Sequence, residues 1–155
     1  MKRRSFLKHS FASGVAVAAA NAGLLTPSSV LADWNKKAFS AKTPDEAISA
    51  VYGSVNAVTS NDIKLKAPAI SENGAVTHIK VDASSMSDVE SIAIFATKNP
   101  MPLVCEYTFS EGALGYVSTR IKMGQTMNLV AIVKAGGQLY KAEQEVKVTI
   151  GGCGG

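Results

Sequence analysis

The stretch Met127–Ile150, MNLVAIVKAGGQLYKAEQEVKVTI, decides the fold. Two extended segments flank Gly136-Gly137, and a glycine pair at such a place is a strong signal for a hairpin turn. The end of the stretch alternates apolar with polar side chains: Val146, Lys147, Val148, Thr149 and Ile150. A period of two places the apolar residues on one face of a strand. The stretch therefore predicts an antiparallel β-hairpin.

Five further segments upstream have the apolar composition and the flanking turn residues of strands: 63–67, 75–81, 92–97, 103–109 and 117–123. We expect four residues of one strand to share an apolar side: Leu103, Cys105, Tyr107 and Phe109. About seven strands at near-regular spacing predict a mainly β protein with an immunoglobulin-like antiparallel β-sandwich. The Cys…Trp…Cys spacing of antibody domains is missing, which excludes that class.

One helix is predicted before the strands. Thr43, Pro44 and Glu46 form a capping box with proline at the first helical position. An apolar face follows at helical spacing, made of Ile48, Val51, Tyr52 and Val55. We expect the helix to run from Pro44 to about Val58.

Residues 1–32 have the layout of an export signal. The basic head Lys2–Lys8 contains Arg3-Arg4-Ser5-Phe6-Leu7-Lys8, which resembles the twin-arginine signal, and no charged residue occurs from His9 to Ala32. A membrane anchor is the alternative, but Asn21 and Pro27 make a poor span. We expect export of the folded protein to the periplasm, with no membrane anchor after cleavage. The mature chain then contains a helix plus sandwich domain over 33–150.

The positive net charge comes from this leader. The chain has 16 Lys and Arg against 12 Asp and Glu, and the charged residues of the leader are all basic. The mature part is formally neutral, so the composition gives no support for nucleic-acid binding.

The chain ends in a Gly-Gly-Cys-Gly-Gly tail, a predicted flexible carrier arm over 151–155: Gly151, Gly152, Cys153, Gly154 and Gly155. Glycines open nearly all backbone conformations, and five residues reach at most about 17 Å. No acid or histidine stands beside Cys153 to form the thiolate, which is the reactive species. The pattern favours a thiol that partner enzymes activate, and so a covalent carrier with no catalytic residue of its own.

Other readings of the two cysteines stay open. Exported proteins usually pair their cysteines, so Cys153 could bridge to Cys105, although that would remove the use of the glycines. Two tails could also bridge to each other. His78 is interpreted as a surface strand residue. The lone mature histidine and the dispersed methionines favour no metal site, and no motif indicates a cofactor.

The combination of leader, helix, sandwich and terminal motif resembles the SoxY family of thiosulfate-oxidation carriers. Two segments carry the likeness besides the leader, 119–126 and 146–155. The resemblance implies that sulfur intermediates are held covalently on Cys153. It implies SoxZ as a stable partner, in a heterodimer or higher SoxYZ complex. Transient partners would be the c-type cytochrome SoxAX, the manganese-dependent hydrolase SoxB and, in some organisms, the dehydrogenase SoxCD.

Two further hypotheses compete with the carrier. An interaction module would use Cys153 for a permanent intermolecular disulfide. An enzyme of the peroxidase or disulfide-exchange type would need a resolving cysteine or an activating neighbour near Cys153, and the sequence has neither beside it.

Overall fold

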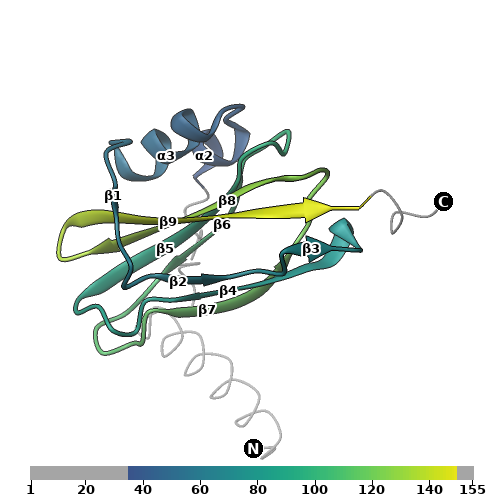
Figure 1. Cartoon of the computed structure of the whole chain (residues 1–155). Coiled ribbons are helices and arrows are strands. Elements are labelled where there is room, and N and C mark those ends of the chain that lie inside the picture. Colours follow the sequence, from purple (N-terminus) through teal and green to yellow (C-terminus); the bar gives the residue numbers. More distant parts are fainter. Residues whose placement is uncertain (1–34, 150–155) are drawn as a thin grey trace, which may run out of the picture. The chain divides into compact units, whose positions relative to one another are not determined.

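The computed structural model describes residues 35–149 (Figure 1). The predicted export signal over 1–32 and the carrier arm over 151–155, including Cys153, lie outside the described residues. The described part contains two sheets and two α-helices, which confirms a mainly β fold with a sandwich of two sheets and an N-terminal helical region.

The large sheet has the strand order β1 (Val58–Thr59), β9 (Gln138–Val148), β8 (Met127–Ala135), β5 (Val89–Ala96), β6 (Leu103–Thr108), and β3 (Ile70–Ser71) also pairs with β9. The small sheet has the order β2 (Lys64–Lys66), β4 (Thr77–Asp82), β7 (Tyr116–Ile121). The helices are α2 (Lys36–Ser40), α3 (Pro44–Tyr52) and the short 3₁₀ turn η1 (Gly74–Val76). The antiparallel prediction holds for the long strands, whereas β1 and β3 both run parallel to β9.

The predicted hairpin is confirmed. β8 and β9 pair from Ala135↔Gln138 to Met127↔Val146. Gly136 and Gly137 have φ angles of 55° and 75°. Two successive positive φ values are what the tight hairpin turn requires, and glycine adopts them without steric cost.

The large sheet is the middle of three layers (Figure 1). One face packs on the small sheet through residues such as Ile94 and Ile79. The other face packs on α2 and α3, where Phe95 lies in one cluster with Ile48. This double burial explains why 92–96 is continuously apolar: a strand covered on both faces needs apolar side chains at every position.

Two predicted details are wrong. The helix ends at Tyr52, because Gly53 takes a left-handed conformation with φ 74° and closes it; Val58 belongs to β1 instead. Leu103 and Cys105 do not share a face. An irregularity in the β5–β6 ladder sets Leu103 opposite Phe95 and Cys105 opposite Ile94, and these two partners face different layers. The short helix α2 was not predicted.

Replacing either of two consecutive residues of β5 by alanine will strongly destabilise the protein. Ile94 and Phe95 are both fully buried, each against a different layer. We expect Ile94→Ala and Phe95→Ala each to cost about 3 kcal/mol, because each leaves a cavity. Urea unfolding measures both. A two-layer protein would tolerate Phe95→Ala at a small cost, and that result would contradict the three-layer arrangement.

Candidate functional site

The root of the predicted arm is the part of the candidate site that the structure describes. Cys153 and the four glycines Gly151, Gly152, Gly154 and Gly155 lie outside the described residues. Thr149, the last described residue, precedes Cys153 by four positions. The conformation up to Thr149 therefore sets where the arm begins.

The end of β9 is held by β3 on one side and by Thr126 on the other. The ladder with β8 ends at Met127↔Val146. Beyond it, the Lys147 and Thr149 amides donate to the carbonyls of Ala69 and Ser71, at 3.0 and 3.2 Å. The Val148 amide, which points the other way, donates to Thr126 Oγ1 at 2.9 Å. Every main-chain amide from Lys147 to Thr149 thus has a hydrogen-bond partner. We call these three residues the arm root, and they are part of the folded domain.

The segment around β3, residues 69–74, is held against the small sheet by hydrogen bonds and close packing. Ser71 is buried, and its hydroxyl lies 2.7 Å from the hydroxyl of Thr77, the first residue of β4. The Gly74 carbonyl accepts from the Met123 amide at 2.6 Å. A methyl group on Gly74 would overlap the Met123 carbonyl and approach a Val148 methyl group to 2.8 Å, so only glycine fits there. These contacts connect the arm root to the ends of β4 and β7. Sequence patterns missed this segment because two-residue strands have no readable period.

The hydroxyl of Thr126 should control the local stability of the arm root. Thr126→Val keeps the shape of the side chain but leaves the Val148 amide without its acceptor. The loss of one such bond costs about 1 kcal/mol, so the exchange of that amide with solvent should quicken about fivefold. Hydrogen exchange followed by NMR measures this. Thr126→Ser keeps the acceptor and should exchange like wild type; equal exchange in all three proteins would contradict the assignment.

Cys105 lies beyond the reach of the arm. The ladder registers place it in one row across the sheet with Ile94, Ala131 and Ala142. Thr149 lies seven residues beyond Ala142 and three strands from Cys105, a separation of about 26 Å at ordinary strand spacings. Four residues extend at most about 14 Å, and the Cα atoms of a disulfide lie about 6 Å apart. The fold therefore disfavours a bridge between Cys105 and Cys153 in one chain.

Cys105 is a free, half-buried thiol on β6 that packs against the core between the sheets. Burial raises the pKa of the Cys105 thiol to about 11, which a hydrogen bond with Tyr107 only partly offsets. Its thiolate is therefore scarce near neutral pH, and the thiol behaves as a small apolar core residue.

The alkylation rate of Cys105 should keep rising well above the ordinary range of thiols. In a Cys153→Ser variant, where Cys105 is the remaining cysteine, the iodoacetamide rate should climb about tenfold per pH unit from about pH 8 to about pH 10. Burial raises the pKa to about 11, so the thiolate fraction is still increasing throughout that window. A plateau near pH 9 in the folded protein would contradict the burial of this thiol.

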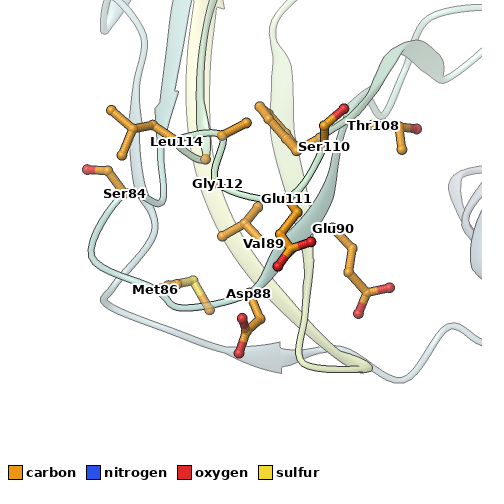
Figure 2. Close-up of a pocket in the computed structure, with 13 residues that line it drawn as sticks. Ser84, Met86, Asp88, Val89, Glu90, Thr108, Ser110, Glu111, Gly112 and Leu114 are labelled. Carbon is orange, nitrogen blue, oxygen red and sulfur yellow. The ribbon is translucent and has the colours of Figure 1, made fainter.

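A cavity of about 420 Å³ opens at the other end of the sandwich (Figure 2). The loop before β5 and the loop between β6 and β7 line it, and it carries the carboxylates of Asp88, Glu90 and Glu111. Such a lining disfavours anions such as thiosulfate. Val89 pairs with Ala135 beside the hairpin turn, so the cavity and the arm root lie at opposite ends of the large sheet. The cavity does not belong to the arm site.

The remaining predicted positions fit surface or core roles. His78 is exposed on β4, and its Nε2 lies 3.0 Å from the Ser118 hydroxyl, which confirms a surface strand residue. Met123 and Met127 are core residues, whereas Met101 is exposed.

Between residues 35 and 149, no three acidic, histidine or cysteine side chains gather closely enough to hold a metal ion. No helix in this range is long and apolar enough to cross a membrane.

Comparison with known families gives a match that extends into the predicted arm. The family model described as "Sulfur oxidation protein SoxY" matches residues 48–153, a range that includes Cys153. The chain belongs to the SoxY family. The match covers the second half of α3, both sheets and the predicted arm as far as Cys153, so the resemblance predicted from the sequence is confirmed.

Solved structures support the same assignment. The sulfur carrier protein SoxY from Chlorobium limicola f thiosulfatophilum is 42% identical, with a TM-score of 0.62, and the alignment covers 68% of this chain and 96% of that one. Superoxide reductase (neelaredoxin) from Ignicoccus hospitalis is 20% identical, with a TM-score of 0.51 over 69% of this chain and 94% of that one. The second likeness shows the fold alone. The comparison with curated proteins found no match.

Proposed function

We propose that this chain is a periplasmic sulfur carrier of thiosulfate oxidation, which holds its cargo covalently on Cys153 while partner enzymes process it. The observation that carries the proposal is the SoxY family match that runs through Cys153. The identity of 42% with a protein described as a sulfur carrier supports it. The fixed root four residues before the thiol supports a role in which Cys153 is presented beyond the domain.

The proposed chemistry needs a thiol and external catalysts. In loading, the Cys153 thiolate and the outer sulfur of thiosulfate form a sulfur–sulfur bond, and the two electrons released pass to the cytochrome SoxAX. In unloading, SoxB adds water to the terminal sulfonate, which leaves as sulfate with two protons, and a persulfide stays on Cys153. The arm residues contain no base, so the deprotonation of Cys153 falls to the partner.

The proposed location and stable partner follow from the leader and the family. The twin-arginine pattern at Arg3-Arg4 supports export in the folded state. Such export suits a chain that first assembles with SoxZ and crosses the membrane with it. SoxAX and SoxB, with SoxCD in some organisms, would then meet the assembled carrier in the periplasm.

Substitution of Cys153 should abolish thiosulfate oxidation without unfolding the domain. In a reconstituted system, Cys153→Ser should lower activity at least about a thousandfold, because no other group takes the covalent bond. Cys105→Ala is the matched control and should retain activity, since its thiol faces the core.

Peptide mass spectrometry of wild-type protein during turnover gives the direct readout. Thiosulfate and persulfide adducts on the C-terminal peptide support the carrier. A Cys153 found only as free thiol, or only in a disulfide with another protein, would overturn it; the second result would favour the interaction module.

A further inference from the structure

The outer face of the small sheet is strongly basic. Alternation along its three strands turns one set of side chains away from the core: Lys64, Lys66, His78, Lys80, Asp82, Tyr116, Ser118 and Arg120. We call these residues the basic face. It carries four of the cations of a mature chain that is formally neutral, against one carboxylate. The sheet lies at the outside of the three layers, so this face is covered by no described element (Figure 1).

Among the described residues, no cation of the basic face forms an ion pair with an acidic side chain, and only Lys64 has a carboxylate, that of Asp82, opposite it in the sheet. The two ion pairs among the described residues, Lys134–Glu90 and Lys141–Glu143, both lie outside the basic face. The Asp82 carboxylate accepts from the hydroxyl and amide of Ser84, which lower the pKa of Asp82, and the nearby charges of Lys64 and Lys66 lower it further. Within the described residues, one carboxylate therefore stands against four cations on this face.

The arrangement also costs stability. Lys66 and Lys80 lie directly opposite each other on β2 and β4, and like charges in that position destabilise a sheet. Arg120 lies opposite His78, which precedes Lys80 by two residues on β4 and lies on the same face of the sheet. Opposed cations that destabilise the small sheet suggest that the basic face binds another molecule.

The basic face begins beside the arm root. His78 and Arg120 stand at the end of the small sheet where β4 starts and β7 finishes. Gly74, close to both Met123 and Val148, connects that end to the end of β9. A protein that covers the basic face would therefore have the start of the arm at its border, and Cys153 follows within about 14 Å of chain.

The composition of the face fits a transient partner. Permanent subunit interfaces are rich in apolar residues, whereas short-lived complexes rely more on charge for encounter and register. Tyr116 is the one large exposed hydrophobic side chain on this face, and the others in the described range lie elsewhere, among them Val58, Ile70 and Met101. The lack of apolar anchors also disfavours insertion into a lipid surface.

We propose that the basic face docks an acidic surface beside the active-site cleft of an enzyme that processes the arm. The inference rests on the proposed carrier function and adds a second contact to it: the face provides charge-steered docking, and the arm delivers the thiol. The attraction raises the rate of encounter and weakens with salt, because added ions screen exposed charges.

Charge reversal separates docking from folding. The test variant is Lys66→Glu with Arg120→Glu. The control is Lys36→Glu with Lys42→Glu, two exposed cations in α2 and in the turn before α3, on the other side of the large sheet. Both carry the same change in net charge. Since Lys66→Glu places a carboxylate opposite Lys80, the test variant should be at least as heat-stable as wild type.

The assays use the SoxYZ complex with the SoxAX and SoxB of the same organism, each at low and high salt. For at least one enzyme, the test variant should raise the KM for the carrier about tenfold at low salt, leave kcat unchanged and flatten the salt dependence. The control should stay within about twofold of wild type.

Three results would overturn the docking proposal: equal KM values in both variants for both enzymes, loss of SoxZ from the test variant alone, or binding of wild type but not the test variant to phosphatidylglycerol vesicles. In each case the wild-type carrier is still loaded on Cys153. A wild type that is never loaded indicates instead that the carrier function itself is wrong.

Discussion

The carboxyl end of β9 is held from both edges, and the placement of the arm depends on that constraint. The ladder with β8 stops at Val146. Beyond it, the Thr126 hydroxyl and the carbonyl groups of Ala69 and Ser71 accept hydrogen bonds from the main-chain amides up to Thr149. Cys153 follows Thr149 by four residues. Because four residues span at most about 14 Å, that distance is the upper limit on the separation between Cys153 and the end of the described strand.

The two cysteines differ in their sequence and structural surroundings. Cys105 lies in the core layer, where burial raises its pKa to about 11 and suppresses the reactive thiolate. Cys153 follows a glycine pair with no base beside it. The acidic cavity with Asp88 and Glu111 lies at the opposite end, so this cavity lies beyond the reach of the arm. The distances that separate Cys105 and the acidic cavity from the arm are consistent with a carrier whose cargo is processed by other proteins, which bind at a separate face.

The sequence predicted the parts of the fold that have a readable period or a special residue. Gly136-Gly137 located the hairpin, and the alternation at the end of β9 placed Val146 and Val148 on the inner face correctly. The apolar run 92–96 was visible, but its cause, burial on both faces, needed the packing of α2 and α3. Gly53 could have ended the predicted helix; the apolar Val55 extended it in error. The irregularity at Leu103 and the two-residue β3 have no local signal. The motif was enough to predict Cys153 as the site residue, whereas the contacts of Ser71, Gly74 and Thr126 that fix the arm root depend on tertiary structure.

Oxidative crosslinking tests most directly whether the fold keeps the arm away from its own core. Dilute, folded protein is treated with diamide, and its peptides are mapped by mass spectrometry without reduction. The separation of about 26 Å between Thr149 and Cys105 predicts disulfides of Cys153 with a second chain or with added glutathione, and none with Cys105 of the same chain. A Cys105–Cys153 disulfide formed within folded monomers would contradict the fixed root and the short reach of the arm.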